Sequence, residues 1–384
     1  ELFHAIFDSD EAATDRTKTE KVLLYREDDS YPLTDIYEST WKNRCNAEKK
    51  LDLRIHFPAD FVYNSTPKTG DKEANGPWAF LWRDGSLRQS TILGRCRAGG
   101  PLQLPFWCVN KTQSLKGDGY TNSAGHGASG MSSLGGLIRI GELTGSEPIS
   151  HALKTTWPAH HYAYYGTDRT GYRWPARRAD GYAGSDSYRG TNRALVMGSL
   201  LALKPDVDIQ RLPLSPTGKK IARALQHYGL YLVEDSGNND TWERWQIFSE
   251  YDVVTGNSVE KEAAAKLNYT FHAGKGDESS FKRDWNVILP LLHIVDNNTP
   301  ETPGGGGTPL VDLQGPTAAR GGRILAFGSA SVAPGEARLY SLQGKRIGGH
   351  ETMRSHALYV KRSGHGAGLV LHDASRQAIE PARR

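Results

Sequence analysis

The stretch Ser215-Pro-Thr-Gly-Lys-Lys-Ile-Ala-Arg-Ala-Leu-Gln-His-Tyr-Gly229 runs directly into Leu230-Tyr-Leu-Val-Glu-Asp235 and carries the clearest structural signals of the sequence. Ser215 is a favoured N-cap, Pro216 suits the first helical position, and Gly229 suits the end of a helix. Apolar side chains between them fall on one face, at Ile221, Ala224, Leu225 and Tyr228. The stretch predicts an amphipathic helix that leads into a buried strand.

Outward from this stretch the patterns are mostly those of strands. Alternating or continuous apolar runs predict further strands at residues 51–57, 137–143, 149–157, 194–203 and 245–254. Gly (42 residues) and Pro (19 residues) are somewhat more frequent than average, which is typical of a turn-rich β protein. We therefore expect a mostly β fold, a β-sandwich or jelly roll with one flanking helix, plus a small C-terminal β-sandwich domain.

The segment 297–309, Asn-Asn-Thr-Pro-Glu-Thr-Pro-Gly-Gly-Gly-Gly-Thr-Pro, has the composition of a linker. It predicts a large domain at 1–296 and a small one at 310–384. Residues 310–384 hold 11 Lys+Arg against 5 Asp+Glu, and they contain none of the nine Trp. The small domain is thus expected to be Arg-rich, with short strands separated by Gly.

Composition excludes several classes of protein. The net charge of +4 is too small and too evenly spread for a nucleic-acid binder. The mean hydropathy is −0.56 and no run approaches the ~20 apolar residues of a membrane helix, so no membrane insertion is expected. The chain begins at Glu1 without Met, which indicates a mature or excised form and agrees with an extracellular or cell-surface location.

The three cysteines allow more than one pairing. Cys96 and Cys108 flank a Gly-Gly-Pro turn that could bring them together, and this predicts a Cys96–Cys108 disulfide. Cys45 is the alternative partner. Three buried thiols in a reducing compartment are the alternative to any bridge.

Residues 157–188 are unusually aromatic. Eight Trp and Tyr side chains stand among Gly, Arg and Asp rather than among aliphatic residues. Flat rings flanked by polar donors suit a sugar, which stacks its C–H face on a ring and uses its hydroxyls for hydrogen bonds, although core packing is the alternative. The predicted substrate-binding residues are Trp157, Tyr164, Tyr172, Arg173, Trp174 and Arg177.

Carboxylates near these rings predict glycoside hydrolysis, which needs two carboxyl groups about 5 to 10 Å apart. Glu142 and Asp180 are the preferred pair, with His151 as a supporting or alternative base, while Glu234 and Asp235 end a predicted strand. A polysaccharide lyase is the second possibility, because His and Tyr can remove a proton and Arg can neutralise a uronate.

Other site types have weaker signals. Residues 125–130, Gly-His-Gly-Ala-Ser-Gly, match neither the dinucleotide fingerprint nor the nucleophile elbow, and predict a tight loop presenting His126. His126 and His151 are the only metal-ligand candidates we single out, without a recognised ligand spacing, and no cofactor is expected.

Two resemblances add to this interpretation. Residues 50–255 resemble a family of secreted bacterial β-sandwich proteins through Gly136-Leu-Ile-Arg-Ile-Gly-Glu-Leu143, Gly171-Tyr-Arg-Trp-Pro-Ala176 and Glu234-Asp235. The pattern of Leu339–Ile347 and Ala357–Arg362, followed by an apolar strand, resembles C-terminal sorting domains of exported bacterial proteins. They imply an exported β protein attached at the cell surface, and they assign no reaction.

The sequence thus predicts a secreted protein that acts on a polysaccharide, most simply by cleaving it. Two alternatives use the same aromatic residues or exposed strands. The first is a non-catalytic carbohydrate-binding or structural protein, and the second is a protein that assembles into a surface filament.

Overall fold

The structure is a computed structural model of the whole chain. It describes residues 3–5, 18–41, 45–62, 76–91, 94–115, 125, 127–236, 245–272 and 278–304, and the strands at 339–341, 346–347, 357–363 and 366–372. The chain divides into two compact units, Glu1–Gly306 and Gly307–Arg384. The division falls within the segment 297–309.

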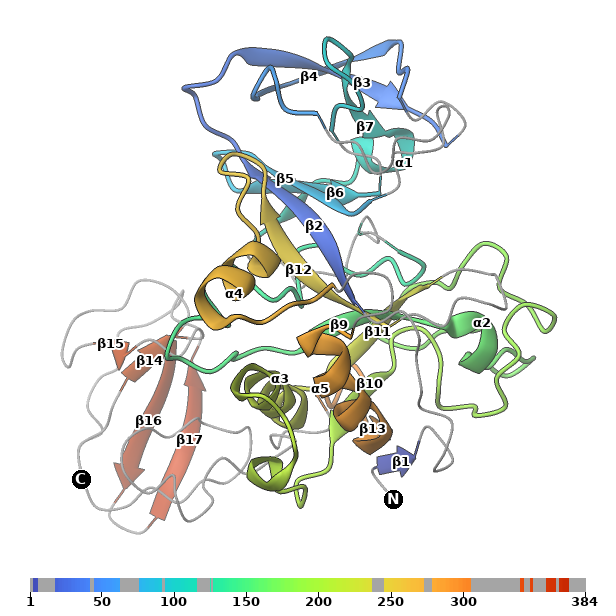
Figure 1. Cartoon of the computed structure of the whole chain (residues 1–384), viewed down its shortest axis with the longest axis vertical. Coiled ribbons are helices and arrows are strands. Elements are labelled where there is room, and N and C mark those ends of the chain that lie inside the picture. The colour runs from blue at the N-terminus through green and yellow to red at the C-terminus, as the bar shows by residue number, and fades with distance from the viewer. Residues whose placement is uncertain are drawn as a thin grey trace. The chain divides into compact units, whose positions relative to one another are not determined.

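A ten-stranded sheet forms the centre of the first unit (Figure 1). In spatial order its strands are β1 (Phe3–Ala5), β13 (Leu292–Val295), β10 (Leu200–Leu203), β11 (Leu230–Asp235), β9 (Leu153–Trp157), β12 (Gln246–Asp252), β2 (Lys18–Arg26), β5 (Trp78–Leu81), β6 (Ser86–Ser90) and β8 (Gln113–Ser114).

The mostly β prediction is confirmed, but the large sheet is mixed. The pairs β9–β11, β12–β2 and β2–β5 are parallel, whereas β9–β12 and β10–β11 are antiparallel. A jelly roll consists of antiparallel strands, so these parallel pairs depart from that expectation. An apolar run marks a buried strand without giving its direction, which depends on connections that the pattern does not contain.

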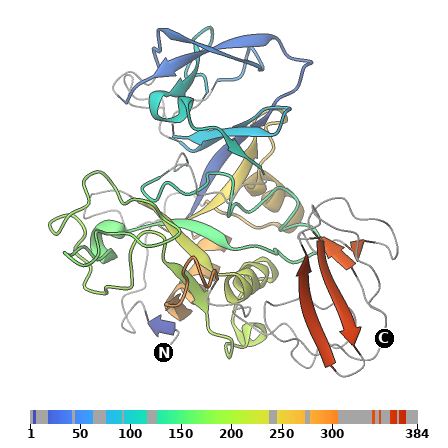
Figure 2. The same cartoon turned by 180° about the vertical axis from the view of Figure 1, so that it is seen from behind.

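Helices cover one face of the sheet near β10 and β13 (Figures 1 and 2). The helix predicted from residue 215 is confirmed as α3 (Pro216–His227), with the Ser215 hydroxyl accepting from the Gly218 N–H. It packs with α5 (Ser280–Ile288) over the main core. The other helical elements are α1 (Phe106–Val109), α2 (Ala159–Tyr162), α4 (Val259–Leu267) and the short 3-10 turns η1 (Ile209–Arg211) and η2 (Leu289–Leu291).

The expectation of one flanking helix was therefore wrong. Both α4 and α5 begin at serine N-caps, Ser258 and Ser279, whose hydroxyls accept from backbone N–H groups three residues on. These caps were available in the sequence as start signals.

The predicted strands are partly confirmed. Residues 51–57, 230–235 and 245–254 correspond closely to β4 (Lys49–His56), β11 and β12, whereas only the second parts of 149–157 and 194–203 are strands, in β9 and β10. Residues 137–143 form turns, with only Ile138 bridging to Ser249. Gly136 and Gly141 adopt positive φ, so the chain bends at both ends of this apolar run.

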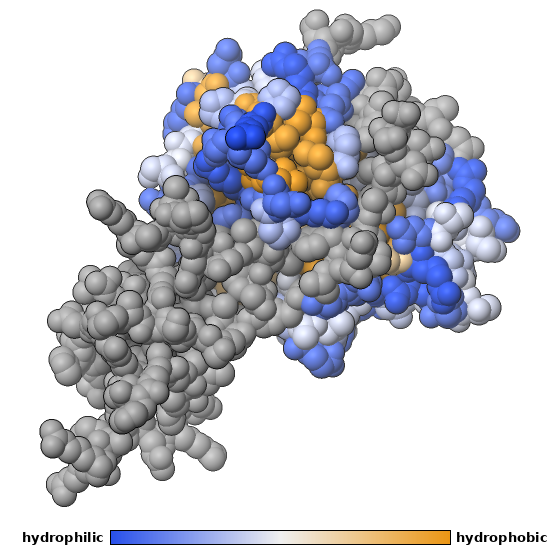
Figure 3. Space-filling view, turned by 90° about the horizontal axis from the view of Figure 1, so that it is seen from below, coloured by the Kyte–Doolittle hydropathy of each residue, from blue (hydrophilic) through white to orange (hydrophobic). Residues whose placement is uncertain are grey.

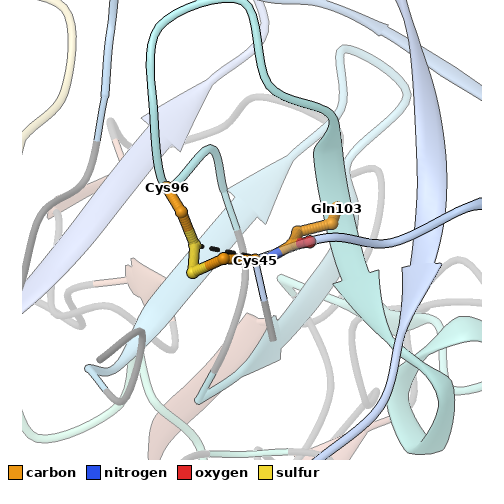
Figure 4. Close-up of a disulfide and its surroundings, with 3 residues drawn as sticks. All are labelled: Cys45, Cys96 and Gln103. Carbon is orange, nitrogen blue, oxygen red and sulfur yellow. Dashed lines mark hydrogen bonds between the residues drawn. A yellow bond between two sulfur atoms is a disulfide. The ribbon is translucent and has the colours of Figure 1, made fainter. Parts of the chain in front are cut away.

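A separate three-stranded sheet, in the order β4, β3 (Leu33–Ser39) and β7 (Leu102–Pro105), completes the first unit. A disulfide joins Cys45 and Cys96 beside it, and Gln103 of β7 donates to the Cys96 sulfur (Figure 4). The predicted Cys96–Cys108 bridge is wrong. Cys108 is a buried free thiol on α1, because the chain enters a helix after β7 instead of forming the expected hairpin.

The described residues of the second unit form one antiparallel sheet of β15 (Arg346–Ile347), β14 (Leu339–Ser341), β16 (Ala357–Ser363) and β17 (Gly366–His372), in that order. Among the described residues, no helix has the length and apolar character needed to cross a membrane. On the surface seen in Figure 3, hydrophilic residues border an apolar area of the first unit.

Candidate functional site

The aromatic segment 157–188 is divided between the core and the surface. Trp157 and Tyr188 are fully buried, whereas Tyr172 is 38% and Tyr182 is 46% exposed. The other four rings are half-buried: Tyr162, Tyr164, Tyr165 and Trp174. The segment is therefore not one continuous row of solvent-facing rings, because its irregular turns point successive side chains in different directions.

One of these rings, Trp174, borders a pocket of about 340 Å³. The pocket lies on the face of the large sheet opposite α3. Its floor is formed by β9 and β11, where Lys154 and Tyr231 are register partners. The lining residues are Met131, Ser132, Gly135, Gly136, His151, Ala152, Leu153, Lys154, Trp174, Pro175 and Tyr231. A pocket with apolar walls and a few polar groups is typical of a small-ligand site.

The loop 131–136 forms one wall and is held by two buried side chains. Lys154 donates from Nζ to the carbonyls of Ser132 (2.7 Å) and Ser133 (2.6 Å). Gln89 of β6 accepts at Oε1 from the Ser132 hydroxyl (3.0 Å) and the Leu134 N–H (3.1 Å). At Gly136, where φ is +77°, a Cβ would lie 3.2 Å from the Lys154 side chain. The wall is thus fixed closely over the floor.

His151 and Glu142 form an ion pair at the edge of the pocket. His151 Nε2 lies 3.0 Å from Glu142 Oε1, and Nδ1 lies 2.9 Å from the Ala152 carbonyl. Two acceptors favour an imidazolium that donates from both nitrogens. Burial opposes this charge, but the hydrogen bonds to Glu142 and Ala152 outweigh it and raise the pKa of His151.

A group of carboxylates lies at the end of β11. Asp180 accepts from the Tyr188 hydroxyl (2.7 Å), and Asp235 accepts from the Tyr182 hydroxyl (2.6 Å) and the Ala159 N–H (3.1 Å). Burial and the nearby carboxylates raise the pKa of both tyrosines, which therefore remain donors. Burial also raises the pKa of Asp180 to about 6, against the Tyr188 hydrogen bond and with the added repulsion of Asp235.

Glu234 lies beside this group and against Gly127. A Cβ on Gly127, whose φ is +96°, would lie 2.3 Å from Glu234 Oε2, so the close approach requires glycine. Burial, followed by the charges of Asp180, Asp235 and Glu20, raises the pKa of Glu234 well above its ordinary value. Two neighbouring carboxyls with raised pKa values are typical of acid/base sites.

The pocket and the carboxylate group are joined by two chain segments. The Arg177 N–H donates to the Ser129 carbonyl (3.0 Å), and Arg178 Nη2 donates to the Gly127 carbonyl (3.1 Å). Segments 127–136 and 173–180 therefore run side by side, with Trp174 and Met131 at the pocket and Asp180 and Gly127 at the carboxylates.

The predicted catalytic residues belong to two places. Glu142 contacts His151, whereas Asp180 contacts Tyr188, and no described contact joins Glu142 to Asp180. His151 and Trp174 line the pocket as expected for site residues. Lys154 and Tyr231 were missed, although a lysine inside an apolar strand was an available signal.

Other predicted binding residues have contacts within the protein. Trp157 belongs to the core, the Tyr164 hydroxyl donates to Asp168 (2.9 Å), and Arg173 Nη2 donates to the carbonyls of Asp296 (2.5 Å) and Asn298 (3.2 Å). Tyr172 and Arg177 are exposed. These contacts give Trp157 and Arg173 a structural role.

Of the two metal-ligand candidates, only His151 belongs to the described residues. His126 lies outside the described residues. Within the described part of the chain, no three His, Cys, Asp or Glu side chains are grouped so that they could hold a metal ion.

The chain matches no known family model, and searches of curated proteins and of solved structures found no similar protein.

Proposed function

We propose that this chain is a secreted protein that cleaves a polysaccharide, most simply as a glycoside hydrolase. The observation that carries the proposal is the placement of Asp180 and Glu234 at one end of segments 127–136 and 173–180, which also form the pocket at Trp174. A sugar ring on Trp174 and Tyr231 would place its neighbour in the chain toward these carboxyls.

The two carboxyls have different expected roles. Glu234, whose pKa burial raises well above its ordinary value, holds its proton more firmly than an exposed glutamate and would donate it to the leaving glycosidic oxygen. Asp180, with a pKa of about 6, is mostly ionised at pH 7 and would act as nucleophile or activate water. Glu234 thus takes the place first expected for Glu142.

A polysaccharide lyase is the second candidate function, and the pocket lining favours it. His151 and Tyr231 both line the pocket. A neutral His151 or a deprotonated Tyr231 could remove the proton beside a uronate carboxyl. The same lining would serve a non-catalytic glycan-binding protein.

The experiment is incubation of the full chain with a panel of plant and microbial polysaccharides, scoring new reducing ends and the absorbance of unsaturated products. We expect reducing ends without unsaturation, lost in Asp180→Asn and Glu234→Gln but kept in the exposed control Asp206→Asn. Unsaturated products that depend on His151 would establish the lyase instead. Binding without turnover would indicate a non-catalytic glycan-binding protein. The absence of both binding and turnover would refute glycan activity.

The location outside the cytoplasm and the role of the second unit belong to the same proposal. The Cys45–Cys96 disulfide supports an oxidising compartment. The excess of Lys and Arg in residues 310–384 and their antiparallel sheet support a small β domain, of the sandwich type first expected, used for attachment. Cell fractionation of a producing strain, with and without residues 310–384, tests this: the full chain should stay with the cell surface and the shortened chain should not.

A further inference from the structure

Lys154 is a buried basic side chain in the floor of the pocket. It is only 3% exposed, and its Nζ contacts the carbonyls of Ser132 and Ser133 and lies 4.6 Å from the centroid of the Phe248 ring. None of these described partners carries a negative charge. Buried ammonium groups are normally paired with a carboxylate, because transfer from water into the protein is costly for an isolated charge.

The rest of the described lining adds no negative charge. His151 is the other ionisable basic residue, and both of its ring nitrogens face acceptors. No Asp or Glu lines the pocket in the described part of the chain, since Glu142 contacts His151 from outside the lining. Apolar walls strengthen the field of a charge at Lys154, because apolar surroundings screen a charge less than water does.

We propose that the pocket binds an acidic sugar, a uronic acid residue of the polysaccharide, whose carboxylate supplies a counter-charge that none of the described contacts of Lys154 provides. This inference rests on the proposed function, because it names the substrate class of that site. The sugar ring lies against Trp174 and Tyr231, and its carboxylate is directed toward Lys154. A sulfated sugar would offer the same charge, and the experiment separates the two.

The test is calorimetric binding of the full chain to oligogalacturonate, to a sulfated galactan oligosaccharide and to a neutral galactan oligosaccharide of equal length. We expect at least tenfold tighter binding of the uronate than of the neutral chain, and a weaker affinity as salt rises. Lys154→Met should abolish this preference, Lys154→Arg should keep part of it, and the exposed control Lys266→Met should keep all of it.

Three results would overturn the inference while leaving glycan binding intact. They are equal binding of neutral and acidic chains, a preference unchanged in Lys154→Met, or a preference for the sulfated chain alone. Should Lys154→Met fail to fold, the salt dependence of the wild-type chain and the Lys154→Arg comparison decide.

The proposed function can fail separately. If no oligosaccharide binds, a thermal shift with free galacturonate against free galactose still tests the pocket. Stabilisation by galacturonate alone, lost in Lys154→Met, would support the acidic ligand without a polysaccharide. Its absence would overturn the acidic ligand, whereas the polysaccharide panel decides the proposed function.

Discussion

At the scale of single residues, the candidate site is built from ionisable side chains that are largely buried. Lys154, Asp180 and Glu234 all have pKa values displaced toward the neutral form by burial, whereas hydrogen bonds displace that of His151 toward the charged form. Folding alone does not favour such displacements, and they concentrate where a site needs proton carriers or a specific charge.

The raised pKa of Asp180 makes a prediction about stability. Its pKa is about 6 in the folded chain, against 3.8 for an unperturbed aspartate, so the folded state holds the proton more tightly. This group therefore lowers the free energy of unfolding as pH rises from about 4 to 6, and the loss persists above pH 6. Asp180→Asn should make that decline shallower by about 3 kcal/mol.

Urea unfolding of both chains between pH 4 and 8 measures this difference. The exposed Asp206→Asn variant is the control and should follow the wild-type curve. If the free energy of unfolding changes with pH in the same way in Asp180→Asn and in the wild type, burial does not raise the pKa of Asp180.

The Glu142–His151 pair makes a second prediction. Glu142→Gln removes the carboxylate that favours the imidazolium, so the pKa of His151 should fall, since burial of the ring then prevails. A histidine-resolved NMR titration measures it. His227 on α3, whose pKa burial and Arg223 lower, is the internal control and should not move. An unchanged His151 pKa would contradict the ion pair.

His151, Asp180 and Trp174 were predicted as site residues because acid, base and ring types stand in a polar context, and the structure places two of them at the pocket and Asp180 beside Tyr188. The sequence marks Lys154 as a lysine within a predicted strand, but its burial and its partners, the carbonyls of Ser132 and Ser133, depend on how the chain folds. The sequence could not choose between cysteine pairings either, because the Cys45–Cys96 bridge closes over 51 residues of separation and depends on how β3 and β7 pair.

At the scale of elements, the sequence signals that act within a few residues predicted helix α3 correctly. The N-cap, first-turn proline and terminal glycine placed α3 correctly, because each acts within a few residues. Residues 137–143 were wrongly predicted to form a strand. They belong to a loop that packs on the sheet, where Leu137 contacts Val233 and Phe248. Burial alone does not reveal whether a residue belongs to a strand.

Two serine caps offer a matched comparison. The Ser279 hydroxyl accepts from the Lys282 N–H and has no other described partner, whereas the Ser215 hydroxyl accepts from the Gly218 N–H and also donates to the buried Asp284 (2.5 Å). Ser279→Ala should cost about 1 kcal/mol. Ser215→Ala should cost about 2 to 3 kcal/mol, because it also removes a hydrogen bond to a buried carboxyl.

Chemical unfolding of both variants at pH 7 checks the order. Equal losses would show that the Ser215–Asp284 bond adds nothing to the cap. A larger loss in Ser279→Ala would show that α5 depends more on its cap than α3 does.

At the scale of the whole molecule, the position of the boundary between the units matters for the pocket. The segment that composition marks as a linker is partly built into the first unit. Asn298 is only 1% exposed, its carbonyl accepts from Arg173, and its Oδ1 accepts from the Gly304 N–H (2.8 Å) and lies 3.4 Å from the Tyr231 hydroxyl. Composition shows that a segment lacks core residues, but it does not show which polar groups the rest of the chain will bind.

Two truncations follow from this difference. A chain ending at residue 306 keeps all of these contacts and should unfold at the temperature of the first unit in the full chain, with unchanged oligosaccharide binding.

A chain ending at residue 296 loses Asn298 and leaves Arg173 and Tyr231 without that partner. We expect it to be less stable by about 2 to 4 kcal/mol, since buried hydrogen bonds to a charged group are lost. Because Tyr231 lines the pocket, its ligand affinity should fall as well. Differential scanning calorimetry and the binding assay above measure both, and equal behaviour of the two truncations would show that residues 297–306 are only a tether.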